Sequence, residues 1–130
     1  MTILLLGKTG QVGFELQRTL SPLGAITAPG RDALDLTCEH AVADVLAQTR
    51  PHLIVNAAAY TAVDTAEQNP QAAQRLNAGL PRQLAEYAAA HSARLVHYSS
   101  DYVYPGTGST PWQETSPTGP LSVYGQTKRE

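Results

Sequence analysis

Residues 3–13 run Ile-Leu-Leu-Leu-Gly-Lys-Thr-Gly-Gln-Val-Gly, and they are the most informative part of the chain about its architecture. An apolar run meets glycines spaced G-x-x-G-x-x-G, and an amphipathic segment with helical spacing follows. The order predicts a buried strand, a phosphate-binding turn and the start of a helix. In such a turn Gly7 leaves the strand sharply, Gly10 lets a pyrophosphate approach the backbone, and Gly13 lets the helix pack closely on the sheet.

The composition describes a small globular domain without a strongly charged partner. The chain has 130 residues, of which 42% are hydrophobic, and a formal net charge of -2. It is therefore one domain with room for a core, and it offers no basic face for nucleic acid or a membrane surface. No apolar run has the length of a membrane span. Cys38 is the one cysteine, which excludes an internal disulfide and favours a cytoplasmic location. The histidines lack the spacing of a zinc site.

Strand and helix patterns alternate along the rest of the chain. Apolar runs at residues 25–28, 51–56 and 94–98 predict further strands, separated by helical segments. This alternation with short links predicts an α/β, Rossmann-like, doubly wound parallel sheet with helices on both faces. Such sheets usually continue further, so we expect residues 1–130 to be an NAD(P)-binding domain truncated before a substrate-binding lobe.

Helix boundaries follow from capping residues. We expect Thr37 to be the N-cap of a helix reaching about residue 46, and Asn69 with Pro70 to start a long helix reaching about residue 90. Asn77 lies within the apolar stripe of that helix, so its side chain should hydrogen-bond a neighbouring loop or backbone. Another helix is expected to begin near Val123.

The end of the second predicted strand bears on cofactor choice. In this fold an acidic residue there favours a free 2′-hydroxyl, whereas an arginine accommodates a 2′-phosphate. The strand ends in Gly30-Arg31, and Asp32 follows, so we expect NADPH, with NADH as the alternative. Asp35 is a candidate acceptor for the adenine amino group, although loop aspartates more often cap local backbone.

Two further loops are expected at the carboxyl ends of the strands. Ala57-Ala58-Ala59-Tyr60-Thr61 follows the third strand, and its small side chains leave room for a flat cofactor. Residues 105–121 are rich in Gly, Pro, Ser and Thr and contain Trp112. This composition predicts a loop that covers the crevice, with the tryptophan as an anchor.

A carbonyl-reducing site is predicted from three side chains. Tyr124 and Lys128 are four residues apart and so share one face of a helix. A nearby ammonium favours the phenolate, which makes a tyrosine usable as an acid and base. Ser100 ends the fourth strand and can donate a hydrogen bond to a carbonyl oxygen as negative charge develops. A lone Y-x-x-x-K pair is common by chance, but here it follows a glycine loop and a serine at a strand end.

Four ordered motifs resemble the extended, nucleotide-sugar-modifying type of the short-chain dehydrogenase/reductase family. They are residues 7–13 (GKTGQVG), 56–64 (NAAAYTAVD), 98–104 (YSSDYVY) and 123–128 (VYGQTK). The likeness extends over the whole chain. It implies an oxidoreductase that uses NADPH or NADH to reduce the 4-keto group of a dTDP-linked sugar, with further substrate-binding residues beyond Glu130.

The resemblance also implies roles for individual residues. Tyr124 would be the proton donor, Lys128 its partner and Ser100 the third catalytic residue, at a position where the family usually carries threonine. Ser100, Asp101 and Tyr124 would contact the substrate. Some relatives carry an acidic residue at the position of Gly30. Together with the arguments above, the expected cofactor-binding residues are Gly7, Gly10, Gln11, Val12, Gly13, Arg31, Asp35, Leu36, Ala58, Ala59, Tyr60, Thr61, Tyr98, Tyr124 and Lys128.

A metal site is implied only by the resemblance. Some relatives are magnesium-linked homodimers that use a glutamate of the first helix, and Glu15 is the matching residue here. An exposed helix charge is the simpler interpretation.

Two alternative functions remain open. A nucleotide-sugar dehydratase or epimerase of the same family would use the same tyrosine and lysine, but a dehydratase typically needs adjacent Asp and Glu, and here Asp101 precedes Tyr102. A non-catalytic dinucleotide-binding subunit is the second alternative. Intact Ser100, Tyr124 and Lys128 argue against it.

Overall fold

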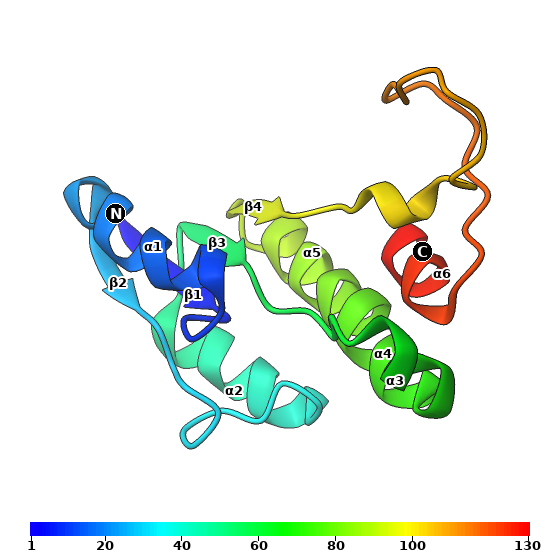
Figure 1. Cartoon of the computed structure of the whole chain (residues 1–130). Helices are drawn as coiled ribbons and strands as arrows, with labels where there is room; N and C mark the ends of the chain where they lie inside the picture. Colours follow the sequence, from blue (N-terminus) through cyan, green and yellow to red (C-terminus); the bar gives the residue numbers. More distant parts are fainter.

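The computed structural model describes residues 1–130, which form a parallel four-stranded sheet in the order β2-β1-β3-β4 (Figure 1). The strands are β1 (Thr2–Leu6), β2 (Ala25–Thr27), β3 (Leu53–Asn56) and β4 (Arg94–His97). Each neighbouring pair is parallel, as the connecting helices require. The predicted Rossmann-like sheet is confirmed. In it, β1 lies at the centre, with β2 on one side and β3 followed by β4 on the other.

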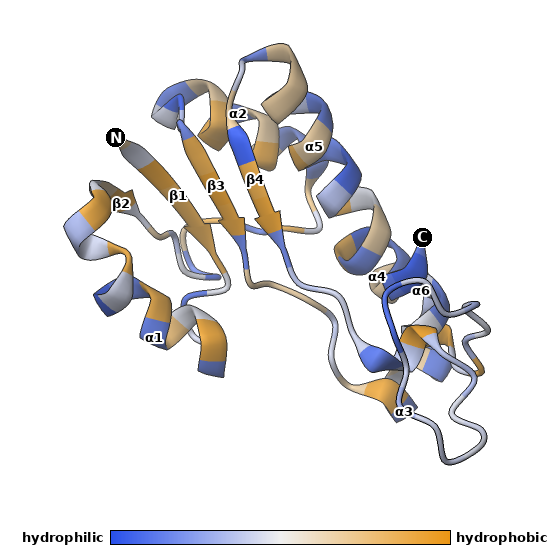
Figure 2. Cartoon of the chain, turned by 90° about the horizontal axis from the view of Figure 1, so that it is seen from above, coloured by the Kyte–Doolittle hydropathy of each residue, from blue (hydrophilic) through white to orange (hydrophobic).

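Helices cover both faces of this sheet, with α1 on one side and α2 and α5 on the other (Figure 2). None of them combines the length and hydropathy needed to cross a bilayer. The α-helices are α1 (Gln11–Thr19), α2 (Glu39–Thr49), α3 (Val63–Gln68), α4 (Pro70–Gln74), α5 (Leu80–Ala90) and α6 (Val123–Arg129). Short 3-10 turns lie at η1 (Ser21–Leu23) and η3 (Asp101–Val103), and a π turn, η2 (Arg75–Gly79), joins α4 to α5.

The core is divided by the sheet into two clusters. Successive residues of β1 point to opposite faces, and because both faces are covered, all of Ile3–Leu6 is buried. On the α1 side, Ile3, Leu5 and Val55 pack with partly buried residues that include Leu16 and Leu20. The larger cluster on the other face consists of Leu4, Leu6, Leu34, Val42, Leu46, Ile54, Leu80, Leu84 and Ala88.

One predicted helix start differs from the structure. Thr37 is not the N-cap of α2, because its N–H and hydroxyl both bind the Asp35 carboxylate and the helix begins after Cys38. The predicted start at Asn69 and Pro70 is confirmed, since Asn69 is the N-cap residue of α4 and Pro70 opens the helix. The Asn69 side chain makes no capping bond, however, and donates backward to the carbonyl of Thr65. In both cases a local hydrogen bond competes with side-chain capping.

The long helix after Pro70 contains a π turn, which the helical spacing did not predict. The N–H of Leu80 bonds to the carbonyl of Arg75, five residues back. Pro81 explains the local change, because it has no N–H and its ring would collide with the carbonyl four residues earlier in a regular helix. The wider turn places buried Asn77 on the side of the helix that faces α6.

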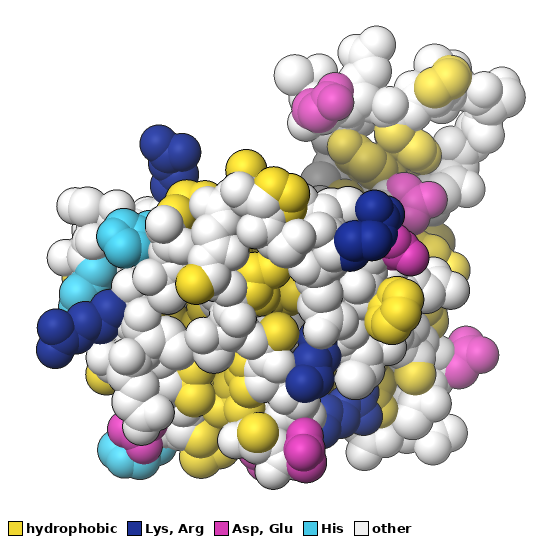
Figure 3. All heavy atoms as spheres, turned by 90° about the vertical axis from the view of Figure 1, so that its left-hand side faces the viewer, with side chains coloured by type: hydrophobic (Ala, Val, Ile, Leu, Met, Phe, Trp, Pro, Cys, Tyr) yellow, Lys and Arg dark blue, Asp and Glu magenta, His cyan; other side chains and the backbone are white.

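The segment from Pro105 to Leu121 does not cover the strand ends. Figures 1 and 2 both show it projecting beside α6, on the side away from β1 and β2. The expectation of a loop over the crevice was wrong. Trp112 does act as an anchor, since its ring stacks on Tyr104 with centroids 5.0 Å apart, but the anchor fastens the projecting segment to the chain just after η3. Figure 3 shows a face on which basic, acidic and apolar side chains are mixed.

Candidate active site

The candidate site lies at the carboxyl edge of the sheet. The ends of β1, β3 and β4 are adjacent, with Leu6 opposite Asn56 and Asn56 opposite His97. The glycine loop, the alanine run and the Ser100 segment therefore leave the sheet side by side. In open α/β sheets, ligands bind in the crevice outside these strand ends.

The glycine loop is shaped by the absence of side chains. Gly7 has φ +86, and a Cβ there would stand 2.6 Å from the backbone of Ala57 and Ala58. At Gly13 a Cβ would lie 2.0 Å from the carbonyl oxygen of Gly7. These contacts confirm the expected sharp turn and close helix packing. Gly10 is the N-cap of α1, and no side chain there bonds to the free N–H groups of the first turn.

The loop after β3 is held by two asparagines. Buried Asn56 accepts from the N–H of Ala58 at 3.2 Å and contacts the Nδ1 of His97 at 3.2 Å. The Asn77 side chain accepts from the N–H of Tyr60 at 2.8 Å and donates to the Tyr60 carbonyl at 3.1 Å. The prediction that Asn77 ties its helix to a neighbouring loop is confirmed.

Helix α6 begins with its N–H groups bonded to side chains. The Ser122 hydroxyl accepts from the N–H of Gly125 at 3.0 Å, and a Glu67 carboxylate oxygen accepts from the N–H of Val123 at 2.7 Å. Gly125 also permits a close approach, because a Cβ there would lie 2.3 Å from the Tyr102 carbonyl oxygen. The helix that carries Tyr124 is therefore packed directly against the segment that follows β4.

Two side chains fasten α6 to the rest of the site. Buried Thr127 accepts from Asn77 Nδ2 at 3.1 Å and donates to the Tyr124 carbonyl at 3.0 Å. The Lys128 ammonium donates to the backbone carbonyl of Tyr98, at the end of β4. Burial lowers the pKa of Lys128 from its usual value. Partial burial likewise lowers the pKa of His97, and the charge of Lys128 lowers it further.

The segment after β4 brings Ser100 and Tyr124 to neighbouring elements. The Ser100 hydroxyl accepts from the N–H of Tyr102 at 3.2 Å and caps η3. The Tyr102 ring meets the Tyr124 ring edge to face, with centroids 5.4 Å apart. Asp101 is exposed beside Ser100. The structure thus brings Ser100, Tyr124 and Lys128 to one end of the crevice, where η3, α6 and the end of β4 meet.

The residues expected at the adenosine end lie in the loop after β2. Arg31 is exposed there. The Asp35 carboxylate is engaged locally, and the Thr37 hydroxyl and N–H lower its pKa. Leu36 packs on the larger core cluster. The capping alternative for Asp35 is thus present in the structure.

The remaining expected cofactor residues lie in the segments that follow β1, β3 and β4. Gln11 and Val12 are exposed in the first turn of α1, and Tyr98 is 39% exposed at the end of β4. The loop between β3 and α3 contains Ala58, Ala59, Tyr60 and Thr61. Their positions at the strand ends are those from which this fold contacts a dinucleotide.

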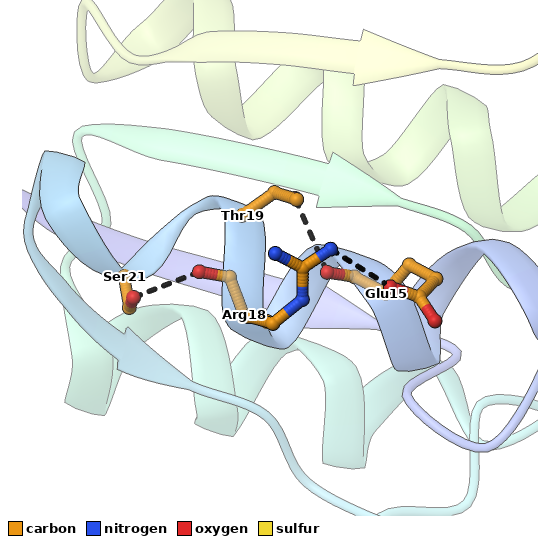
Figure 4. A network of polar contacts seen from close by, with 4 residues as sticks. All are labelled: Glu15, Arg18, Thr19 and Ser21. Atoms are coloured by element: carbon orange, nitrogen blue, oxygen red, sulfur yellow. Dashed lines mark hydrogen bonds and ion pairs between the residues drawn. The ribbon is translucent and has the colours of Figure 1, made fainter.

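Glu15 lies away from any group of metal-ligating side chains. Its carboxylate pairs with Arg18 at 3.2 Å on the exposed surface of α1, beside the local hydrogen bonds of Thr19 and Ser21 (Figure 4). The chain contains no cluster of three His, Cys, Asp or Glu side chains placed to hold an ion. Within a single chain, Glu15 is thus an exposed helix charge paired with Arg18.

The roles of several supporting residues were not found from the sequence. Glu67, Thr127 and Gly125 act through contacts between distant segments. Gly125 and Thr127 belong to the motif at residues 123–128, but the motif alone does not show which segments they contact. Thr127 next to Lys128 predicts no contact by itself, and neither does Glu67 in the short helix α3. Only the buried asparagine could be found, because a polar residue within an apolar stripe requires partners.

Comparison with known proteins places this site in a family. A sequence profile for the RmlD substrate binding domain matches residues 1–130. The chain belongs to this family. It is 52% identical to dTDP-4-dehydrorhamnose reductase of Salmonella typhimurium strain LT2 over 132 aligned residues, which cover 98% of this chain and 44% of that protein. The chain therefore spans less than half the length of this curated relative.

Solved structures of similar proteins agree with the fold. A dTDP-4-dehydrorhamnose reductase from Clostridium acetobutylicum superposes with a TM-score of 0.92 at 35% identity, covering 99% of this chain and 46% of that one. The enzyme of that name from Bacillus anthracis, solved in complex with NADP, superposes with a TM-score of 0.90 at 34% identity, covering 98% and 46%. A UDP-glucose 4-epimerase from Thermotoga maritima, at 21% identity, shares the fold.

Proposed function

We propose that residues 1–130 form the NAD(P)-binding domain of an oxidoreductase that reduces the 4-keto group of dTDP-4-dehydro-L-rhamnose to give dTDP-L-rhamnose. The observation that carries the proposal is the meeting of the glycine loop and the Ser100, Tyr124 and Lys128 segment at one edge of the sheet. The 52% identical relative is named for this activity, and a similar structure holds NADP. NADPH is the proposed cofactor, and the cytoplasm the proposed location.

The loops at the strand ends fit a dinucleotide. At Gly7 and Gly13, backbone atoms of neighbouring segments occupy the position where a Cβ would stand. The glycine loop therefore packs closely on the chain around it. The open N-terminus of α1 offers unbonded N–H groups to a pyrophosphate. Ala58 and Ala59 follow β3 directly and carry only small side chains. When bound, the nicotinamide would supply a hydride to the carbonyl carbon.

The chain's own side chains would handle the proton. Tyr124 would donate its phenolic proton to the carbonyl oxygen as the charge on that oxygen develops. The Lys128 ammonium lies one helical turn away and favours the phenolate that results. Ser100 would donate a hydrogen bond to the same oxygen. Thr127 and Asn77 hold the backbone of α6 in place for this step.

The decisive experiment follows NADPH absorbance when dTDP-4-dehydro-L-rhamnose is added to the longest form of the protein that carries these residues. Replacing Tyr124 by phenylalanine should lower turnover by about 10³-fold, because general acid catalysis is lost, and should weaken NADPH binding in fluorescence titrations far less than it lowers turnover. Tyr87→Phe is the matched control, since it removes a hydroxyl that bonds to the Leu46 carbonyl in the helical layer. Turnover unchanged by Tyr124→Phe would contradict the assignment.

The 130-residue chain alone should bind NADPH and turn over little or no keto sugar. The sugar-recognition residues are proposed to lie outside it, since its curated relative is more than twice as long. Measurable reduction of the sugar by these residues alone would refute this part. A homodimer and a magnesium ion at Glu15 remain predictions. The ion would need ligands from a second copy, because this chain supplies no cluster of metal-ligating side chains.

The dehydratase alternative is less well supported. A dehydratase would need an acid and a base next to the strand-four hydroxyl, and Asp101 is followed by Tyr102, whose ring packs on Tyr124. Consumption of NADPH in proportion to the sugar distinguishes a reductase from a dehydratase or an epimerase, which regenerate their cofactor. Binding of NADPH without any turnover would favour the non-catalytic alternative.

A further inference from the structure

The two residues that flank Tyr124 have their backbone N–H groups bonded to side chains. The N–H of Gly125 donates to the Ser122 hydroxyl at 3.0 Å, a bond formed within the same turn. The N–H of Val123 donates to a Glu67 carboxylate oxygen at 2.7 Å, from a residue 56 positions away in the sequence. Of these two bonds, the one to Glu67 ties the turn that carries Tyr124 to another element.

Glu67 extends from a backbone that is fixed by packing. It belongs to α3, and the neighbouring Ala66 is 0% exposed, whereas Glu67 itself is an exposed residue. A carboxylate that accepts from a backbone N–H forms a charge-assisted hydrogen bond, which is stronger than a bond between neutral groups. A negative charge is also favourable at the N-terminus of a helix. Both effects hold the first turn of α6 against α3.

The helix that carries Glu67 follows the loop expected to contact the cofactor. Residues 58–61 lie between β3 and α3. The Tyr60 backbone in this loop is bonded to Asn77, whose side chain also donates to Thr127 of α6. Two routes therefore connect the loop with α6. One runs through Asn77 to the second turn of α6, and the other runs along α3 through Glu67 to the first turn.

The Glu67 carboxylate has no cationic partner. None of the three ion pairs of the chain includes it, and the bond from Val123 is its one side-chain hydrogen bond. An exposed carboxylate of this kind adds little to the stability of a fold. Its single bond nevertheless ends at the residue next to Tyr124, the proposed proton donor.

We propose that Glu67 is a positioning residue for the proposed reduction, because its bond to the N–H of Val123 holds the Tyr124 phenol where its proton can reach the substrate carbonyl oxygen. The inference rests on the proposed function. Proton transfer needs the donor within hydrogen-bond reach of the acceptor, and a displacement of about 1 Å can lower a rate by about 100-fold. Without Glu67, the first turn of α6 would keep Ser122 as its one side-chain partner.

The contact between two aromatic rings reports the position of this phenol. The Tyr124 ring meets the Tyr102 ring edge to face, with centroids 5.4 Å apart and an angle of 79° between the planes. Tyr102 belongs to η3, which follows β4, so α6 does not carry it. A displacement of the first turn of α6 would therefore alter the ring contact, and no substrate is needed to observe it.

Three substitutions in the longest form of the protein that carries these residues separate hydrogen bonding from charge. Glu67→Gln keeps the length and an accepting oxygen but removes the charge. Glu67→Asp keeps the charge but shortens the side chain by a methylene group, and Glu67→Ala removes both. Glu86→Gln, which removes an exposed carboxylate from α5, is the matched control.

The first measurement is the single-turnover rate of NADPH oxidation at saturating keto sugar. Glu67→Ala and Glu67→Asp should each lower this rate by about 10-fold, while the NADPH dissociation constant and the KM for the sugar change by less than about twofold. Glu67→Gln should retain the rate to within about threefold. Glu86→Gln should change none of these quantities.

The second measurement is NMR of the same variants with isotope-labelled tyrosine. Nuclear Overhauser contacts between the Tyr102 and Tyr124 rings should be weakened in Glu67→Ala and Glu67→Asp and kept in Glu67→Gln. Tyr124→Phe identifies the signals of the Tyr124 ring. These contacts do not depend on which substrate the protein uses.

Several outcomes would overturn the proposal. An equal loss of rate in Glu67→Gln and Glu67→Ala would show that the charge matters and not the bond. An unchanged rate in Glu67→Ala and Glu67→Asp, or unchanged ring contacts in both, would show that Glu67 does not position the phenol. If Glu67→Ala does not fold, the comparison of Glu67→Asp with Glu67→Gln decides. If the unmodified protein does not reduce the sugar, the proposed function fails, and the ring contacts still decide whether Glu67 positions Tyr124.

Discussion

The N-termini of α1 and α6 differ in what their first backbone N–H groups bond to. The first turn of α1 begins at Gly10, with no side-chain cap and no acidic residue. The first turn of α6 is bonded to the Ser122 hydroxyl and to the Glu67 carboxylate. An open helix end can bind an anion, whereas a capped end is already satisfied. The N-terminus of α1 is therefore free to bind a ligand, whereas the bonds at the N-terminus of α6 fix the position of that helix.

The same difference extends to the surroundings of each helix. Around α1 the close contacts are backbone to backbone, through Gly7 and Gly13. Around α6, side-chain hydrogen bonds through Asn77, Thr127 and Lys128 add to one close backbone approach, at Gly125. Substitutions of the glycines should therefore act through steric overlap, and substitutions of Asn77 or Thr127 through lost hydrogen bonds.

The largest effect is expected at Gly13. Replacement by alanine forces a methyl group to 2.0 Å from the Gly7 carbonyl oxygen, so the free energy of unfolding should fall by about 3 kcal/mol or more. Urea denaturation measures the change. Gly10→Ala is the control in the same loop, because its Cβ would lie at an ordinary 3.5 Å from Gly7. It should cost less than about 1 kcal/mol. Equal losses of stability in the two variants would contradict the steric explanation for Gly13.

A smaller effect is expected at Asn77. Alanine removes hydrogen bonds to both backbone groups of Tyr60 and to Thr127, which should lower the free energy of unfolding by about 2 kcal/mol. Thr127→Val removes the Thr127 hydroxyl alone and should cost about 1 kcal/mol. Denaturation curves of both variants test the order. A larger loss for Thr127→Val would mean that the loop after β3 does not depend on the asparagine.

The smallest expected effect is a pH dependence of the free energy of unfolding that arises at His97, beside Lys128 of α6. The pKa of His97 in the folded chain lies below its usual 6.5, through burial and the Lys128 charge. Between that folded-state value and 6.5 the unfolded chain binds more protons, so stability should fall as the pH falls below 6.5. Comparing denaturation of the chain and of His97→Gln across this window tests the sign. An identical acid dependence in the variant would exclude His97 as the cause.

The sequence predicted most of the sheet and the turn that follows β1, because these depend on local patterns. Apolar runs identify buried strands, and the spacing of Gly7, Gly10 and Gly13 identifies the turn. The α2 start was misplaced because Asp35 takes the Thr37 donors. The π turn depends on how Pro81 is accommodated within the packed helix. The bond between Val123 and Glu67 depends on α3 and α6 being brought together by the fold, which no local pattern encodes.

The outer edge of β4 affects how the isolated chain behaves in solution. β4 ends the sheet, so one row of its backbone groups has no strand partner, and the side chain of Val96 is 43% exposed beside it. An unpaired edge with a β-branched side chain is a template on which a second strand can align. The exposed charge of Arg94 at the start of the strand opposes such pairing. At the β4 edge of the sheet, edge-to-edge pairing of two copies is therefore opposed by the charge of Arg94.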